Sequence, residues 1–219
     1  LRNERYNLGD IKKLAVLVSG NGSNLQSIID SINIGEINAN ISLVISNIET
    51  AYALTRAKKE NLNSAFLNHK NFSSRESFDQ ALSELLIKHE VDLIVLAGFM
   101  RILSNSFIEK FNKKIINIHP SLLPKYPGLK THEKVINNKD KFHGVTIHLV
   151  DEGLDSGPII AQARFKATKY KDIDSLITKV HSIEHKLYPL IIKMIVEGEI
   201  NLNELNGKNF KCYEDEFDL

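Results

Sequence analysis

Short apolar runs alternate with longer amphipathic stretches along the first half of the chain. The apolar runs predict strands at residues 14–19, 41–46, 64–67, 91–97 and 115–118. The amphipathic stretches, with apolar residues three and four positions apart, predict helices near residues 24–35, 51–61 and 74–89. The run 91–97, apolar except for Asp92, is typical of a parallel strand covered on both faces. Strand and helix repeated in this order predict βαβ units and a Rossmann-like half.

The helix expected near residues 74–89 carries its own start signal. Ser73 and Glu76 have the spacing of a capping box, in which each side chain bonds the backbone of the other residue. The apolar stripe of this helix consists of Phe78, Leu82, Leu85 and Leu86. Such a stripe predicts that the helix packs on the sheet.

The second half of the chain has a different pattern. A loop rich in proline and glycine, residues 120–128, precedes a short helix near residues 132–138. Strands near 145–150 and 158–166 follow, and the link 151–157 between them is short enough to favour antiparallel pairing. The parallel half is therefore expected to continue into a mixed sheet of an α/β fold.

A long helix over about residues 172–197 and a small β tail end the sequence. We find no internal repeat and no linker of low complexity. We therefore predict a single domain over residues 14–200, with a polar N-terminal extension at 1–13 and a C-terminal tail, 201–219, packed on the domain.

Asn117 and His119 lie at the carboxyl end of an apolar run, directly before Pro120. Side chains two positions apart in a strand point the same way, so the amide and the imidazole share one face. Pro120 cannot donate to a sheet ladder, so the strand should end there. Open α/β sheets place their sites at this edge. Asn117 offers donors to a developing oxyanion, and His119 can supply or relay a proton.

The segment 19–24 reads Ser-Gly-Asn-Gly-Ser-Asn between the first predicted strand and helix. Glycines there let backbone N–H groups approach an anion, and the helix dipole adds positive potential. The closing Gly-Lys-Ser/Thr of a P-loop is missing, and Leu25 replaces the third glycine of a dinucleotide fingerprint. Ser23 and Asn24 add short donors, which suits one phosphate monoester. The alternative is an ordinary tight turn with Asn24 as the helix N-cap.

Asp155, in the link 151–157, is a candidate partner for His119. Its carboxylate would hold the ring in one tautomer and raise the pKa of His119. The alternative is a solvated turn aspartate beside a buried, hydrogen-bonded histidine. His148 shares a strand face with Thr146, and we expect it to support the site structurally.

Glu184 falls on the apolar stripe of the long helix, between Val180 and Leu187. A carboxylate in this position is costly unless it is paired or bound to ligand hydroxyls. The alternative is that Pro189 kinks the helix and turns Glu184 outward.

The composition of the chain argues against several classes of partner and binding site. The 219 residues are 42% hydrophobic, and 28 basic against 27 acidic residues give a net charge of +1, which argues against nucleic acid or an acidic membrane as a partner. The single cysteine, Cys212, excludes an intrachain disulfide, and no two histidines have zinc-site spacing, so we expect no metal. No apolar run reaches the roughly 18 residues of a membrane span, and the polar start lacks a signal-peptide core. We expect a cytoplasmic protein.

Four motifs occur in one order across about residues 14–200. They are Ser-Gly-Asn-Gly-Ser-Asn-Leu-Gln at 19–26, Ala-Gly-Phe-Met-Arg-Ile-Leu at 97–103, Asn-Ile-His-Pro-Ser-Leu-Leu-Pro-Lys-Tyr-Pro-Gly at 117–128 and Leu-Asp-Ser-Gly-Pro at 154–158. In these residues the chain resembles the folate-dependent glycinamide ribonucleotide (GAR) formyltransferases of purine biosynthesis. Other formyl-folate enzymes share the Asn, His and Asp, but the first and third motifs point to the GAR enzymes. The resemblance implies the three-layer α/β/α formyltransferase fold.

The resemblance also implies roles for individual residues. The catalytic residues would be Asn117, His119 and Asp155. The GAR-binding residues would be Gly22, Ser23, Asn24, His181, Ser182, Ile183 and Glu184. The folate-binding residues would be Arg75, Met100, Arg101, Ile102, Leu103, Asn117, Asp151, Glu152, Gly153, Leu154 and Asp155. Ser156 departs from the family, which has a second glycine there, and would stiffen its loop.

The implied reaction transfers the formyl group of 10-formyltetrahydrofolate to the amine of GAR, without a metal, in a monomer or homodimer. The main alternative is a formyltetrahydrofolate hydrolase, in which water accepts the group; Pro120 and Leu122 beside His119 disfavour it. A Rossmann-type module that binds a nucleotide without turnover is disfavoured by the poor glycine fingerprint. A structural subunit of a larger assembly is a further alternative.

Overall fold

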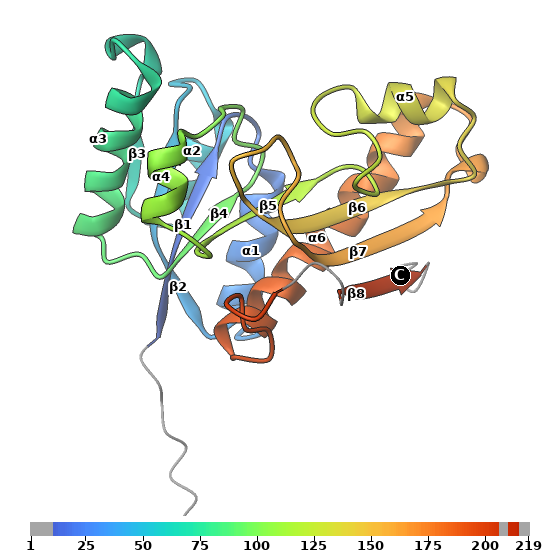
Figure 1. Cartoon of the computed structure of the whole chain (residues 1–219). Helices are drawn as coiled ribbons and strands as arrows, with labels where there is room; N and C mark the ends of the chain where they lie inside the picture. Colours follow the sequence, from blue (N-terminus) through green and yellow to red (C-terminus); the bar gives the residue numbers. More distant parts are fainter. Residues whose placement is uncertain (1–10, 206–209, 215–219) are drawn as a thin grey trace, which may run out of the picture.

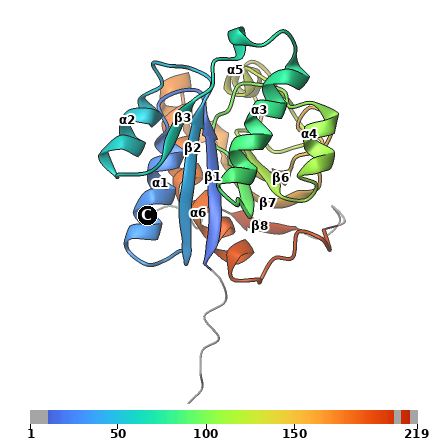
Figure 2. The ribbon, with the colours of Figure 1, turned by 90° about the vertical axis from the view of Figure 1, so that its left-hand side faces the viewer.

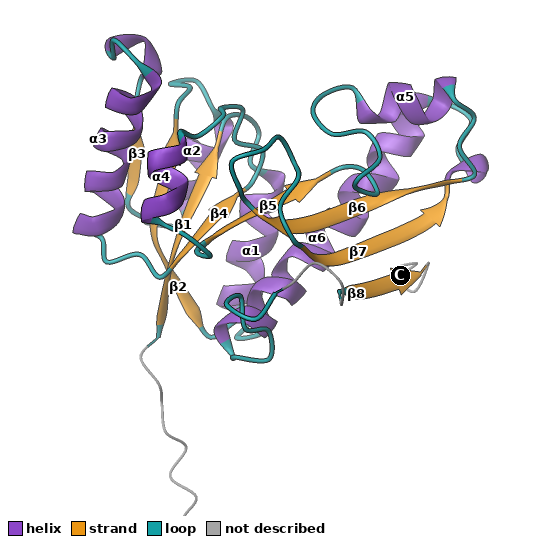
Figure 3. Ribbon diagram, viewed as in Figure 1, coloured by secondary structure: helices purple, strands orange, loops and turns teal. Residues whose placement is uncertain are grey.

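Eight strands form one mixed sheet in the computed structural model, which describes residues 11–205 and 210–214 (Figure 1). The strands cross the sheet in the order β3-β2-β1-β4-β5-β6-β7-β8 (Figure 3). They are β1 (Lys12–Val18), β2 (Ala39–Ser46), β3 (Ser64–Phe66), β4 (Leu93–Leu96), β5 (Ile115–His119), β6 (Phe142–Leu149), β7 (Ile159–Lys166) and β8 (Lys211–Glu214).

The pairing of the strands changes halfway across the sheet. Strands β1 to β5 pair in parallel, β6 is antiparallel to both β5 and β7, and β8 is parallel to β7. The antiparallel β6–β7 pair confirms what the short link 151–157 predicted. The Rossmann-like half and its continuation into a mixed sheet are confirmed as well.

Helices cover both faces of the sheet and complete three layers (Figure 2). The helices are α1 (Ser23–Asn33), α2 (Tyr52–Lys59), α3 (Arg75–Lys88), α4 (Asn105–Lys110), α5 (Thr131–Asn137) and α6 (Ile173–Val196), with single 3-10 turns η1 (His69–Asn71) and η2 (Ala167–Lys169). One buried apolar cluster joins the sheet to α1, α2, α5 and α6, and the other joins it to α3 and α4. Among the described helices, none is long and apolar enough to cross a membrane.

Strand β1 shows why its sequence is apolar at successive positions. Leu14 and Val16 belong to the cluster on the α1 and α6 face, whereas Ala15 and Leu17 belong to the cluster on the α3 and α4 face. All four side chains are fully buried. A strand with helices on both faces cannot alternate apolar and polar residues.

Several expected element starts were wrong, among them those of β2, β4 and β6, which begin at Ala39, Leu93 and Phe142 instead of 41, 91 and 145. Two further shifts have a local cause. The capping box of α3 is formed by Ser74 and Ser77, each hydroxyl accepting from the backbone N–H of the other, because the helix begins at Arg75 and leaves Ser73 outside it. Strand β1 begins at Lys12 because Lys12 and Lys13 already pair with β2. On the other side, the Asp92 N–H donates to the Lys13 carbonyl and the Asp92 carboxylate accepts from the Lys13 N–H.

Helix α4 has no counterpart among the predicted elements. It has six residues, and the Ser104 hydroxyl caps it by accepting from the Phe107 N–H. The predicted β tail is present as β8, on the outer edge of the sheet. Within the predicted extension 1–13 and tail 201–219, residues 1–10, 206–209 and 215–219 lie outside the described residues, and the division of the chain into these segments stays a prediction.

The loops that follow β1 and β4 meet at one edge of the sheet. The Ser19 N–H donates to the Gly98 carbonyl at 3.0 Å, and the Met100 N–H donates to the Ser19 hydroxyl at 2.8 Å. The glycine loop and the segment 97–103 therefore lie side by side. Strand β5 is hydrogen-bonded to β4 and ends at the same edge with His119.

Candidate active site

Asn117 is held by a histidine on the neighbouring strand. Strands β5 and β6 pair so that Asn117 faces His148, and Asn117 Nδ2 lies 3.2 Å from His148 Nε2. His148 Nδ1 lies 2.8 Å from the Leu149 carbonyl, which can only accept. The ring therefore carries its proton on Nδ1, and its Nε2 accepts from the Asn117 amide. His148 fixes which end of this amide faces it, the supporting role expected of it.

Asp155 contacts both proposed catalytic side chains of β5. Its Oδ2 lies 3.3 Å from His119 Nδ1, and its Oδ1 lies 3.5 Å from Asn117 Nδ2. The Gly128 N–H also donates to Oδ2, at 2.8 Å. Asp155 does occupy a turn, with a left-handed φ of 51° that aspartate tolerates well. However, its side chain is only 12% exposed and faces His119, unlike a solvated turn residue.

The second ring nitrogen of His119 faces the Tyr126 carbonyl. The distance from Nε2 to this oxygen is 2.9 Å, and because a carbonyl only accepts, Nε2 carries a proton. The contact between Nδ1 and the Asp155 carboxylate then requires a second proton between these two atoms. The ring that satisfies both neighbours is the imidazolium form.

Burial and charge act in opposite directions on this pair. Burial lowers the pKa of His119 below its usual value, and the Tyr126 carbonyl and Asp155 charge oppose it. Burial by itself raises the pKa of Asp155, but the neighbouring His148 side chain, the hydrogen bond from the Gly128 N–H and the His119 charge lower it overall. Asp155 is therefore ionised near neutral pH, whereas for His119 the two hydrogen-bonding neighbours favour the imidazolium form and burial favours the neutral ring.

A buried polar network fastens the loop after His119. Thr146 and Gln162 continue the row of His119 across β6 and β7. The Thr146 hydroxyl donates to the Ser121 carbonyl at 2.6 Å and accepts from the Leu123 N–H at 3.0 Å and from Gln162 Nε2 at 2.9 Å. Sequence reasoning missed Gln162. The available signal was a polar residue within a mostly apolar strand.

The glycine loop starts α1 without a capping side chain. Gly22 is the N-cap, with a φ of 74°, and a Cβ atom there would lie 2.6 Å from Ala53 Cβ, so only glycine fits. The first N–H groups of a helix have no partner within the helix. Asn24 lies inside the helix, so the expectation that it is an ordinary N-cap was wrong. Its Nδ2 donates instead to Glu184 Oε2 at 3.1 Å.

Glu184 points into the protein. Helix α6 runs unbroken past Pro189, and Glu184 is 6% exposed, so the alternative of an outward rotation was wrong. Burial raises the pKa of this carboxyl to about 7, against a smaller lowering by the Asn24 amide. The glycine loop and α6, far apart in sequence, thus meet at one carboxyl group. Among the described residues, neither Asn24 Oδ1 nor His185 Nε2 has a hydrogen-bond partner.

The other proposed GAR residues of α6 differ in orientation. His181 is exposed and stacks on His185, with ring centres 6.0 Å apart. The Ser182 hydroxyl donates to the Lys179 carbonyl. The Ile183 side chain lies in the apolar core, 2% exposed, because it faces the sheet. Among these three side chains, the His181 ring is therefore the one open to solvent.

The proposed folate residues include three exposed apolar side chains. Met100, Ile102 and Leu154 are 67%, 60% and 58% exposed. Exposed apolar side chains in such a group are typical of a ligand-binding surface. Leu103 differs, because its side chain is buried in the core beneath α3 and α4.

The proposed folate residues also include charged side chains. Arg75 is exposed at the first position of α3, and the Arg101 guanidinium lies 5.0 Å from the centre of the Phe78 ring. Glu152 accepts from Asn105 Nδ2.

The loop 151–155 is held by its own hydrogen bonds. The Ser156 hydroxyl and the Gly153 N–H both donate to Asp151 Oδ1, at 2.7 and 3.2 Å. Ser156 thus ties down the loop, as the sequence predicted for this departure from the family.

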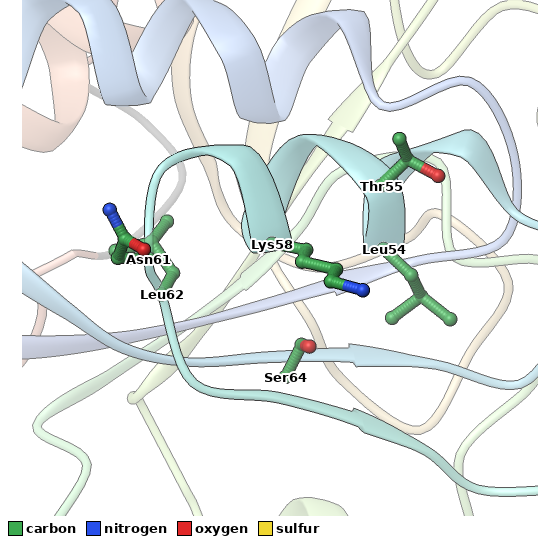
Figure 4. Close-up of a pocket in the computed structure, with 6 residues that line it drawn as sticks. All are labelled: Leu54, Thr55, Lys58, Asn61, Leu62 and Ser64. Carbon is green, nitrogen blue, oxygen red and sulfur yellow. The ribbon is translucent and has the colours of Figure 1, made fainter.

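A surface hollow lies outside this site. An open hollow between α2 and β3 shares no residue with it; Figure 4 shows its lining residues Leu54, Thr55, Lys58, Asn61, Leu62 and Ser64. Within residues 11–205 and 210–214, no three His, Cys, Asp or Glu side chains are grouped to hold a metal ion.

The chain is similar to several known proteins. Residues 12–192 match the model of the Formyl transferase family. A phosphoribosylglycinamide formyltransferase of Haemophilus influenzae is 45% identical over 202 residues, covering 90% of this chain and 95% of the relative. The Escherichia coli enzyme of that name is 41% identical over 191 residues, covering 87% of this chain and 90% of the relative. The Coxiella burnetii structure of that name superposes with a TM-score of 0.87 at 39% identity, covering 93% of this chain and all of that one.

Proposed function

The chain belongs to the formyl transferase family and, within it, to the phosphoribosylglycinamide formyltransferases of purine biosynthesis, and we propose that Asn117, His119 and Asp155 catalyse its reaction. The formyl donor is 10-formyltetrahydrofolate, and the acceptor is the amine of GAR. The contacts of Asp155 with both other side chains support this assignment most directly.

The GAR amine attacks the formyl carbon, and the formyl oxygen becomes an oxyanion. Asn117 Nδ2 can donate to this oxygen in place of its long 3.5 Å contact with Asp155. His119 Nε2 can donate by exchanging the Tyr126 carbonyl for the same oxygen. Each such donor lowers the barrier by roughly 3–4 kcal/mol, and placing the amine beside the formyl group contributes roughly 7–11 kcal/mol.

The second step breaks the bond between the formyl carbon and the folate nitrogen. The attacking amine must lose a proton, and the folate nitrogen must gain one. Asp155 orients His119 through Nδ1, and the pair passes this proton on through water. The reaction then balances without a metal.

The two substrates occupy opposite sides of Asn117 and His119. The N–H groups of Gly22, Ser23 and Asn24 bind the GAR phosphate at the start of α1. Glu184, with His181 and the adjoining backbone of residues 182–183, binds the ribose region. The apolar side chains of Met100, Ile102 and Leu154, the backbone of Leu103 and the loop 151–155 hold the pterin, with Arg101 beside them, and Arg75 pairs with the glutamate tail. The cytoplasmic location and the monomer or homodimer remain predictions from the sequence.

Mixing purified protein with GAR and 10-formyltetrahydrofolate, and following deformylated folate by absorbance, tests the function. We expect folate release only when GAR is present. Release without GAR would indicate the hydrolase instead. No release in either mixture would point to another acceptor or to binding without turnover.

A further inference from the structure

Arg56 on α2 forms hydrogen bonds on both sides of Gly22: with Asn21 in the glycine loop and with Gln26 in the first turn of α1. Its Nε donates to the Asn21 carbonyl and its Nη2 to Asn21 Oδ1, both at 2.9 Å, while Nη1 donates to Gln26 Oε1 at 3.0 Å. The guanidinium also lies 4.9 Å from the centre of the Tyr52 ring. All three guanidinium nitrogens are therefore engaged, and the planar group is fixed in one orientation.

The backbone of α2 reinforces the same contact. The Ala53 N–H donates to the Gly20 carbonyl at 3.2 Å, and Gly22 packs directly against Ala53. The carbonyls of Gly20 and Asn21 are thus both bound by donors of α2. Carbonyl oxygens facing an anion would repel it, so binding them to α2 leaves the unpaired N–H groups of α1 to face the anion.

The charge of Arg56 also extends to α6. Burial lowers the pKa of His185, and the positive charges of His181 and Arg56 lower it further. The guanidinium therefore acts on the part of α6 that carries Glu184. A phosphate monoester carries about −1.5 to −2 charges near neutral pH, so this potential favours it over a neutral hydroxyl.

We propose that Arg56 is a positioning residue that makes the glycine loop selective for a phosphorylated acceptor. It acts through Asn21 and Gln26, whose conformation sets the N–H groups of residues 22–24. This role rests on the proposed function of the loop as the phosphate site. It adds a residue from a separate helix to that site.

Assays with two acceptors distinguish this positioning role of Arg56 from a general contribution to the fold. The variants Arg56→Met and Arg56→Lys are assayed with GAR and with the same acceptor lacking its phosphate. We expect Arg56→Met to lower kcat/KM for GAR by about 10- to 100-fold and to change that for the dephosphorylated acceptor, and the KM for the folate donor, by less than about twofold. Arg56→Lys keeps the charge but not the fork, so most of the loss should remain.

Lys59→Met is the matched control, because Lys59 lies one turn away on α2, is exposed, and also lies over the Tyr52 ring. It removes a positive charge without touching the loop, and its selectivity should equal that of the wild type. Equal losses on both acceptors in Arg56→Met, or the same result as Lys59→Met, would overturn the proposal. If Arg56→Met does not fold, Gln26→Met removes the Nη1 contact from the loop side and should lower the preference for GAR; an unchanged preference would also overturn it.

The assay of the wild type distinguishes a failure of the proposed function from a failure of the proposed role of Arg56. If the wild type releases no folate with GAR, the proposed function fails. The role of Arg56 is then decided by inorganic phosphate, which should raise the Tm of the wild type more than that of Arg56→Met. Equal shifts would reject it.

Discussion

His119 Nδ1 lies 3.3 Å from Asp155 Oδ2, although His119 ends strand β5 and Asp155 occupies a left-handed turn between β6 and β7. Both side chains are largely buried, with 6% and 12% of their surface exposed. Each therefore affects the protonation of the other, and removing either one changes the electrostatic surroundings of the remaining group.

Replacing Asn117 or His119 by alanine should remove a donor to the oxyanion. We expect kcat to fall by about 10²-fold or more in each variant, because a single oxyanion donor contributes this much. The fold should persist, which thermal unfolding followed by circular dichroism will show. Turnover close to that of the wild type in either variant would rule out the assigned role.

Asp155→Asn should be comparably damaging. Asparagine tolerates the left-handed backbone and can still accept from the Gly128 N–H, so the turn should remain. The charge that favours protonated His119 is lost, and we expect kcat to fall by about 10²-fold. Steady-state kinetics measures this change, and a mild effect would make Asp155 a turn residue only.

Glu184→Gln should change how stability depends on pH. Burial raises the pKa of Glu184 from 4.5 to about 7, so the folded protein keeps a proton that the unfolded chain releases between these values. The wild-type free energy of unfolding therefore falls as pH rises through this window, by up to about 3 kcal/mol for this group. The variant lacks this term, so its stability relative to the wild type should be greater at pH 8 than at pH 5. Urea unfolding at pH 5 and pH 8 measures the difference in free energy of unfolding between the variant and the wild type. The same difference at both pH values would contradict the prediction.

Ser23→Glu should impair the binding of GAR and spare that of the folate. The added carboxylate would stand at the start of α1, where it would repel the phosphate and occupy its space. We expect the KM for GAR to rise at least tenfold (about 1.4 kcal/mol) while the KM for 10-formyltetrahydrofolate stays within about twofold. Unchanged affinity for GAR would remove the phosphate assignment.

The sequence predicted the parallel half of the sheet well. Runs such as 93–97 are apolar at every position because helices bury both faces of the strand, and this pattern is visible in the local sequence. The placement of Asn117 and His119 on one face also follows from the two-residue period of a strand. The capping box of α3 was misplaced by one residue because Ser73 and Ser74 are adjacent and either can cap.

The contacts of these residues could not be predicted in the same way. Glu184 on an apolar stripe was compatible with an inward or an outward position, and only the packing of α6 beside α1, with its Asn24 contact, places it inside. The role of Arg56 left no local mark, and that of Gln162 left only a polar residue within a mostly apolar strand, because each acts on a loop from another part of the chain.

The sequence by itself therefore determined the succession of strands and helices along the chain, apart from α4 and the 3-10 turns. It also determined the edge where the proposed site lies and the residue types available there. Tertiary structure decided which side chains meet: His119 with Asp155, Asn117 with His148, and Arg56 with Asn21. The physical reason is that burial and backbone hydrogen bonding impose periodic patterns on neighbouring residues. Contacts between distant elements depend instead on strand register and helix packing, and these are set only when the whole chain is folded.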